Sequence, residues 1–250
     1  MLESKAVSKC TRVSAETGAA SAAQRSILAD LDLFSGVDGR VLYGIEQACR
    51  YRRFAAQEQI VDKDSPASDV YFIVRGRARV VIYSVSGREI TFADLVEGDY
   101  FGEISAIDGK PRATGVMAIE ECVVLAVPRR LFLKVLADHP QVALRVMQRL
   151  ASIIRGANDR IMDLSTLGAQ NRVQAELLRQ AQIHKTIRNT AVIEPIPMHS
   201  DIASRVSTTR ETVARVLNDL ARRGIVQRTR TALLIRNVQL LHMMVEEVRG

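Results

Sequence analysis

One segment of the sequence combines the residue types needed to hold an anion. In EGDYFGEISAIDGKPRATGV, residues 97–116, a predicted turn at Gly98 precedes a short helix that begins near Gly102. Glycine lets the backbone approach a ligand closely, the start of a helix offers free N–H groups, and Arg112 supplies a fixed cationic fork. Glu103 can accept hydrogen bonds from sugar hydroxyls. The segment predicts an anion pocket with one sugar-reading carboxylate; the competing interpretation is a structural Glu103–Arg112 ion pair that closes a hairpin.

A second segment has the chemistry of a DNA-reading helix. Thr209, Arg210, Glu211 and Thr212 open a predicted helix, where free N–H groups and the positive helix end favour phosphate. In the first turns of that helix, Arg210 and Arg215 can each donate two hydrogen bonds to guanine, and Glu211 can accept from cytosine. The competing interpretation is an exposed Glu211–Arg215 salt bridge, which is worth only about 0.2–0.5 kcal/mol.

Positive charge is concentrated in the part of the chain that contains this second segment. The 250 residues include 35 Lys and Arg against 28 Asp and Glu, a formal net charge of +7. From Ser165 to the end, 13 basic residues face 7 acidic ones, so 13 − 7 = +6 of the excess lies in the C-terminal third. Such a basic balance favours a polyanionic partner.

The sequence argues against several other kinds of protein. Cys10, Cys49 and Cys122 are isolated from one another and do not cluster with histidine, so we expect no metal site. No P-loop, G-x-S-x-G or H-E-x-x-H motif is present, and we expect no catalysis. No apolar run reaches the roughly 18 residues of a membrane helix, and no N-terminal apolar segment indicates a secretory signal. We therefore expect a cytoplasmic protein without a membrane partner.

Changes of pattern divide the chain into four parts. Residues 1–25 are small and polar, and we expect a flexible tail. Residues 26–138 contain short β-branched segments such as VYFIVRG and ECVVLAV between turn residues, a pattern typical of an antiparallel jelly roll. Residues 139–168 are predicted to form a dimerisation helix and hinge. Residues 169–250 are predicted to form a winged helix-turn-helix domain that binds DNA.

The predicted long helix has a regular apolar seam. The seam follows alternating spacings of four and three residues: Ala143, Met147, Leu150, Ile154, Ala157, Ile161 and Leu164. This spacing is typical of a coiled coil, so we expect a homodimer through Ala143–Leu164. The competing interpretation is a long helix that packs only on its own domain. A hinge is expected at residues 165–170, where Gly168 stops the helix.

The C-terminal segment has the order of elements of a winged helix-turn-helix. HSDIASRV and RETVARVLNDLARRG are helical patterns joined by the turn residues STT, and IVQRTR and ALLIRN can pair as a β wing. The expected fold class is therefore α+β, with an N-terminal β jelly roll, a long dimerisation helix and a C-terminal winged helix-turn-helix.

Both segments resemble parts of one known family. FGEISAIDGKPRATGV is similar to the phosphate-binding cassette of cyclic-nucleotide-binding domains, in a form also found in regulatory subunits of protein kinase A. The heptad helix followed by TTRETVARVLNDLARRGIV resembles the DNA-binding half of the Crp–Fnr transcription regulators. The resemblance runs from about Ile27 to Met244. It identifies the chain as similar to Crp–Fnr regulators of the cAMP receptor protein type, with an intact cassette.

The resemblance implies a nucleotide site. In the family, the glutamate of F-G-E binds the ribose 2′-hydroxyl and the arginine of P-R-A holds the cyclic phosphate, which implies these roles for Glu103 and Arg112. The implied site is completed by the backbone of Gly102, Ile104, Ser105 and Ala113. Ala157 and Asn158 occupy the purine-reading positions of the long helix without the hydroxyls of the enteric cAMP receptor protein, although the Asn158 amide can donate and accept. Ala113, where Thr often accompanies cGMP preference, favours cAMP over cGMP.

The resemblance also implies a DNA site. The implied DNA-binding residues are His199, Ser200, Thr209, Arg210, Glu211, Thr212 and Arg215. Arg210, Glu211 and Arg215 match the base-reading set of the family and imply palindromic sites with half-sites similar to TGTGA. His199 and Ser200 are expected to contact phosphate. Ser207 stands in the turn where the family usually has glycine.

The implied function is a transcription regulator that is switched by cAMP or cGMP and acts as a homodimer on double-stranded DNA. Ligand binding beside the long helices would shift the population towards a state in which the helix-turn-helix is repositioned. RNA polymerase is a further implied partner. Two alternatives stay open: a regulator of the same fold that ignores cyclic nucleotides or binds another effector, and a regulatory subunit or channel sensor that shares the cassette, which the helix-turn-helix opposes.

Overall fold

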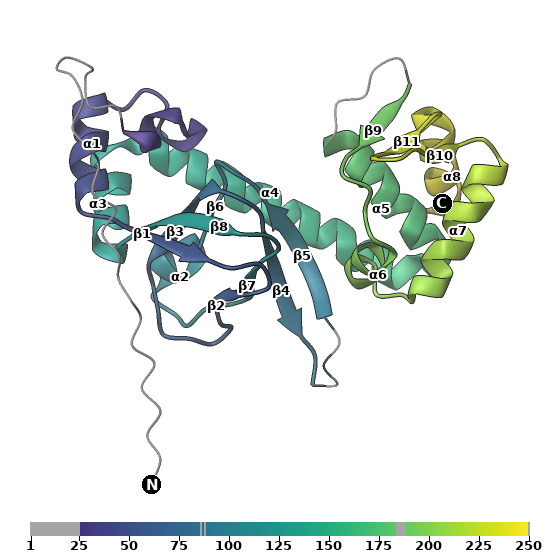
Figure 1. Cartoon of the computed structure of the whole chain (residues 1–250), viewed down its shortest axis with the longest axis horizontal. Coiled ribbons are helices and arrows are strands. Elements are labelled where there is room, and N and C mark those ends of the chain that lie inside the picture. Colours follow the sequence, from purple (N-terminus) through teal and green to yellow (C-terminus); the bar gives the residue numbers. More distant parts are fainter. Residues whose placement is uncertain (1–25, 86, 88, 184–188, 250) are drawn as a thin grey trace, which may run out of the picture.

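One long helix connects a β-rich unit at one end of the molecule to a helical unit at the other (Figure 1). The computed structural model describes residues 26–85, 87, 89–183 and 189–249. The tail expected at residues 1–25 therefore lies outside the described residues. The architecture is α+β, as predicted.

Two four-stranded antiparallel sheets form the N-terminal unit. The first has the strand order β1 (Arg50–Phe54), β8 (Cys122–Val127), β3 (Val70–Arg75) and β6 (Tyr100–Phe101). The second has the order β2 (Gln59–Val61), β7 (Gly115–Ala118), β4 (Ala78–Tyr83) and β5 (Glu89–Leu95). Along β3 the side chains alternate, because Tyr71 and Ile73 join the core between the sheets whereas Phe72 joins the core on the outer face. This alternation is the jelly-roll pattern that the sequence predicts.

Helices cover the outer face of the first sheet. They are the 3-10 helices η1 (Ile27–Asp30) and η2 (Asp32–Phe34), α1 (Gly39–Gln47), α3 (Arg129–Asp138) and the first turns of α4 (Pro140–Thr166). Leu28, Leu42, Phe72, Phe132 and Val142 are buried in the core that they share. The short helix α2 (Glu103–Asp108) lies between β6 and β7 in the sequence.

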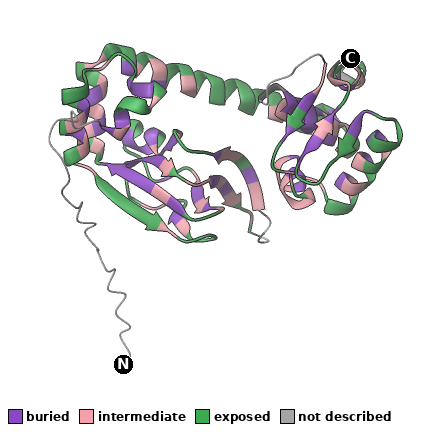
Figure 2. Cartoon of the chain, turned by 45° about the horizontal axis from the view of Figure 1, so that its top comes forward, coloured by how far each residue is buried: buried purple, intermediate pink, exposed green. Residues whose placement is uncertain are grey.

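The long helix α4 leaves most of its predicted seam open. Val142 and Val146 pack into the core of the N-terminal unit, but Met147, Ile154 and Ile161 are 57%, 60% and 60% exposed. Residues 151–159, in the middle of the helix, are all exposed (Figure 2). A helix that packs only on its own domain does not account for these apolar side chains.

The C-terminal unit contains the predicted helix pair and wing. Its elements are α5 (Ala169–Ile183), β9 (Ala191–Ile193), α6 (His199–Arg205), α7 (Arg210–Arg222), β10 (Val226–Arg228), β11 (Leu233–Ile235) and α8 (Val238–Arg249). Strands β10 and β11 pair as expected, but β9 adds a third strand on the other side of β11. Helix α8 also goes beyond the prediction and buries Leu241 and Val245 in the core of this unit. None of the helices in the described ranges is long and apolar enough to cross a membrane.

Candidate functional site

Glu103 and Arg112 are both buried in the N-terminal unit. Strand β6 ends at Phe101, and Gly102, with a φ of 91°, turns the chain so that Glu103 becomes the first residue of α2. Arg112 lies in the loop before β7. The two residues are only 5% and 3% exposed. Because burying a charged group is costly unless a partner or ligand compensates, this pair marks a candidate binding site.

The Arg112 guanidinium is held by main-chain oxygens rather than by a carboxylate. Its Nη1 donates to the Gly102 carbonyl at 3.0 Å, and its Nη2 donates to the Asp69 carbonyl at 2.5 Å. Within the described part of the chain, no ion pair joins Arg112 to Glu103, and the buried Arg112 Nε has no hydrogen-bond partner. The competing interpretation of a structural ion pair is therefore not supported. A buried N–H donor without an acceptor fits an anionic ligand.

The Glu103 carboxyl lies in a poorly solvated position, where two arginines influence its pKa. Burial raises the pKa of Glu103, while a backbone hydrogen bond, Arg149 and Arg112 act in the opposite direction. A carboxylate in such a place gains from hydrogen bonds that a ligand supplies, because water cannot supply them.

Two residues at this site, Tyr100 and Arg149, go beyond the sequence prediction. Arg149 lies on α4, with its guanidinium carbon 4.2 Å from the centroid of the Tyr100 ring. Its Nη1 pairs with Asp99 at 3.2 Å and its Nη2 donates to the Tyr100 carbonyl at 2.9 Å. The buried Tyr100 hydroxyl has no partner among the described residues, and burial raises its pKa to about 12. Arg149 therefore ties the long helix to the cassette, and its position beside the seam was the only sequence signal for it.

The remaining predicted nucleotide residues lie on the cassette and on α4. Ser105 is buried, and its hydroxyl lies 3.5 Å from the Pro111 carbonyl. Ile104 and Ala113 are exposed. Ala157 and Asn158 are exposed on α4, farther along the helix than Arg149, and in the described residues no hydrogen bond ties Asn158 to the cassette.

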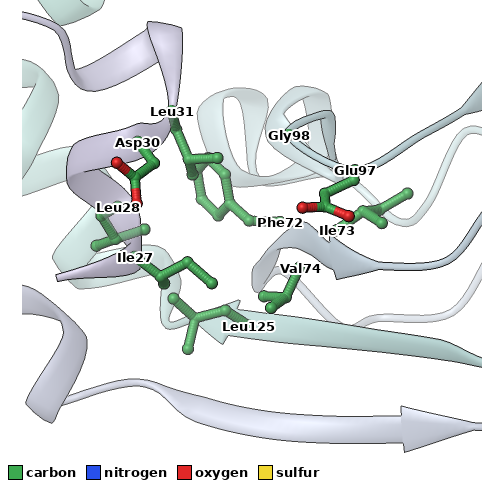
Figure 3. Close-up of a pocket in the computed structure, with 10 residues that line it drawn as sticks. All are labelled: Ile27, Leu28, Asp30, Leu31, Phe72, Ile73, Val74, Glu97, Gly98 and Leu125. Atoms are coloured by element: carbon green, nitrogen blue, oxygen red, sulfur yellow. The ribbon is translucent and has the colours of Figure 1, made fainter.

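A separate cavity of about 320 Å³ lies on the outer face of the first sheet. Apolar side chains of η1, β3 and β8 line it, and the carboxylates of Asp30 and Glu97 lie at its edge (Figure 3). Neither Glu103 nor Arg112 belongs to its lining. This cavity is therefore distinct from the candidate nucleotide site.

The predicted DNA-reading residues are exposed at the start of α7. The Thr209 hydroxyl caps this helix by accepting from the backbone N–H of Thr212 at 3.3 Å. Arg210, Glu211 and Arg215 are exposed, and no ion pair joins Glu211 to Arg215 within the described ranges. Hydrogen bonds from its own backbone N–H and from the Thr209 hydroxyl lower the pKa of Glu211, which favours its acceptor form. The competing salt-bridge interpretation is therefore not supported.

The turn between α6 and α7 is fixed by an arginine. Ser207 has a φ of 52°, the left-handed conformation that glycine adopts most easily. Arg172 on α5 donates to the carbonyls of Val206 at 2.9 Å, Ser207 at 3.3 Å and Leu167 at 2.8 Å. His199 and Ser200, at the start of α6, are half-buried.

Comparison with known proteins agrees with this architecture. Residues 51–139 match the family model of the cyclic nucleotide-binding domain, and residues 171–244 match that of the Crp-like helix-turn-helix domain. The cyclic AMP receptor protein of Thermus thermophilus is 33% identical over 160 residues, which cover 63% of this chain and 70% of that protein. The chain belongs to the Crp–Fnr family.

Other members of the Crp–Fnr family extend the match. The CRP-like cAMP-activated global transcriptional regulator of Mycobacterium tuberculosis is 27% identical over 84% of this chain and 94% of its own length. The structure of a CooA variant from Carboxydothermus hydrogenoformans covers 89% of this chain and 97% of that one, with 22% identity and a TM-score of 0.74, and supports the fold. The chain is thus a Crp–Fnr transcription regulator with a cyclic nucleotide-binding domain. Because these relatives are regulators, the expectation that it is not an enzyme is confirmed.

Proposed function

We propose that this regulator binds a cyclic nucleotide at Glu103 and Arg112 and, in response, binds palindromic DNA as a homodimer. The observation that carries the proposal is the buried Arg112 Nε, which lacks an acceptor in a domain of the cyclic nucleotide-binding family. Arg112 would hold the phosphate and Glu103 the ribose 2′-hydroxyl. Backbone groups that would complete the site are those of Gly102, Ile104, Ser105 and Ala113.

We favour cAMP over cGMP as the ligand. Ala113 supports this preference, and so do the names of two relatives, a cyclic AMP receptor protein and a cAMP-activated regulator. The exposed position of Asn158 on α4 leaves its amide free to approach a purine once a second copy packs on this helix.

The exposed seam of α4 supports the homodimer. In the described residues, Met147, Ile154 and Ile161 of this seam are exposed within one protomer, and a second copy of α4 would bury them. The dimer would present two copies of α7 to successive major-groove faces, with base-reading roles for Arg210, Glu211 and Arg215 and phosphate roles for His199 and Ser200.

We further assign residues 26–138 as the nucleotide-binding domain, with RNA polymerase as a partner and a cytoplasmic location.

Calorimetric titration with cAMP and with cGMP tests the nucleotide site. We expect wild-type protein to bind, Arg112→Ala to lose binding, and the matched surface variant Arg130→Ala on α3 to bind as the wild type does. Unchanged binding by Arg112→Ala would remove the phosphate role. A gel shift on a TGTGA-type palindrome with and without each nucleotide then tests the switch. If the palindrome is retarded equally with and without each nucleotide, this result would support a different effector instead.

The same gel shift tests the base-reading role of Arg210. Replacing Arg210 by alanine should cost about 1–3 kcal/mol at one base pair and relax the sequence preference at that position. Binding constants for palindromes substituted at each base pair would show this. A uniform weakening across all palindromes would assign Arg210 to the phosphate backbone.

A further inference from the structure

An ion-pair network joins the nucleotide-binding unit to the DNA-binding unit within one protomer. Arg79 on β4 donates from Nη1 to Asp201 Oδ1 at 2.8 Å and from Nη2 to Asp201 Oδ2 at 3.0 Å. Asp201 belongs to α6, the first helix of the helix-turn-helix. The Nε of Arg79 donates to Asp94 on β5 at 2.7 Å, and Arg205 of α6 pairs with the same carboxylate at 2.7 Å. Two carboxylates and two guanidinium groups thus alternate across the boundary.

A neutral hydrogen bond accompanies these ion pairs. The hydroxyls of Thr91 on β5 and Ser204 on α6 lie 2.9 Å apart. Thr91 is fully buried and Arg79 is 9% exposed, so the contact is poorly solvated. Bidentate charge-assisted bonds in a poorly solvated place fix the relative orientation of the two surfaces. We name this set the docking cluster: Arg79, Thr91, Asp94, Asp201, Ser204 and Arg205.

The docking cluster is a second attachment of the DNA-binding unit. The first attachment is the chain itself at Leu167 and Gly168, where Arg179 of α5 pairs with Asp163 of α4 at 2.8 Å. A unit held only at this connection could rotate about it. Contact at a second, distant point removes that rotation, so the docking cluster sets the angle of the DNA-binding unit.

The docking cluster lies close to the nucleotide site in the sheet. Strand β7 begins at Gly115, shortly after Arg112, and pairs with β4, where Arg79 lies opposite Met117. A movement of Arg112 on ligand binding would therefore act on the strand next to Arg79. With α6 docked, Arg210 and Glu211 of α7 stay exposed, so docking leaves the DNA-reading face open.

We propose that the docking cluster positions the DNA-binding unit for DNA and carries the coupling between nucleotide and DNA. Arg79, Thr91 and Asp94 are positioning residues that act through α6 rather than by touching either ligand. The coupling part of this inference rests on the proposed function, whereas the docking part stands without it. Two experiments separate the two parts.

Limited trypsin digestion of the nucleotide-free protein tests docking. The variants are Asp201→Asn and Thr91→Val, which remove the ion pair and the hydroxyl contact without adding a trypsin site. The matched control is Asp219→Asn, because the ion pairs of Asp219 in the described structure are local, with Arg222 at 3.2 Å and Arg223 at 4.0 Å at the end of α7. We expect cleavage between the two units to become several-fold faster in both variants and to stay unchanged in the control. Wild-type cleavage rates in both variants would overturn the proposal, whether or not a nucleotide binds.

The DNA dissociation constant with and without cAMP tests coupling. The ratio of the two constants cancels any direct effect of a charge on DNA affinity. We expect this ratio to fall about threefold or more in both variants because the nucleotide-bound protein binds DNA less tightly, and cAMP affinity with and without DNA should change by the same factor. The proposal would be overturned if this ratio changed only in Asp201→Asn. It would also be overturned if Thr91→Val bound DNA more tightly than wild type in the absence of nucleotide. A wild-type ratio of one would contradict the proposed function instead.

Discussion

Gly102 holds the cassette in a conformation that other residues adopt only with strain. Its φ is 91°, and an added Cβ would lie 2.4 Å from Arg112 Nη1 and 2.8 Å from the Asp69 carbonyl. Gly98 has the same φ but no atom within 4 Å of such a Cβ. Substitution of Gly98 therefore tests backbone strain alone, whereas substitution of Gly102 tests strain together with contact with the guanidinium.

We predict that Gly102→Ala lowers cAMP affinity by about tenfold or more, because the Arg112 guanidinium must move. Gly98→Ala, the matched control, should lose about 1–2 kcal/mol of unfolding free energy from strain and retain its affinity. Calorimetry and urea unfolding measure both quantities. Equal affinity losses in the two variants would argue against a role of the close approach.

We expect Glu103 to lower the free energy of unfolding at neutral pH while it contributes to ligand binding. Burial raises its pKa above 4.5, so the folded state binds this proton more tightly than the unfolded chain does. The stabilisation that comes from this tighter proton binding is fully present below about pH 4.5. It is lost as the pH rises through the raised pKa. At neutral pH the buried carboxylate is therefore a cost to the folded state.

Glu103→Gln should consequently raise the free energy of unfolding at pH 7, and the gain should vanish in acid below pH 4.5. Its cAMP affinity should fall about tenfold, because one charge-assisted hydrogen bond to the ligand is weakened. Urea unfolding at both pH values and calorimetry provide the test. A variant that is less stable than wild type at pH 7 would contradict the prediction.

At the scale of elements, the turn between α6 and α7 stores strain at Ser207. A non-glycine residue at a φ of 52° costs about 1–2 kcal/mol, whereas glycine adopts this conformation freely. The greater entropy of glycine in the unfolded chain offsets part of this gain. Ser207→Gly should therefore raise the unfolding free energy by about 0.5–1 kcal/mol. Ser207→Ala keeps the Cβ and serves as the control in the same urea titration. Equal stability of the glycine and alanine variants would show that the turn is not strained.

Local patterns explain which elements the sequence predicts. Alternating β-branched residues, glycine turns and the seven-residue spacing of α4 are short-range signals, and the corresponding elements are present. Strand β9 has only three residues and is defined by its pairing with β11, a contact distant in the sequence. The Arg79–Asp201 pair spans 122 residues, and Arg149 reaches the cassette only because α4 packs on the first sheet. Such tertiary contacts leave no local pattern to read.

At the scale of the whole molecule, the open seam of α4 should decide the oligomeric state. Ile154→Glu places a carboxylate in the expected dimer interface, where burial of an unpaired charge should raise the dimer dissociation constant about tenfold or more. Ser152→Glu adds the same charge at an exposed position outside the seam and is the control. Sedimentation equilibrium measures both. A dimer that tolerates Ile154→Glu would place the interface elsewhere.

The separation of the hydrophobic cores along α4 has an evolutionary consequence. The C-terminal unit has a core of its own, and within the described structure α4 buries no residue between Val146 and Asp163. A genetic crossover between Leu150 and Asp163 would join the nucleotide-binding unit of one regulator to the DNA-binding unit of another without dividing either core. Such a chimaera would keep both cores, yet it would respond to its ligand only where the charges on its β4–β5 hairpin and on the first helix of its helix-turn-helix had been inherited as a matching pair.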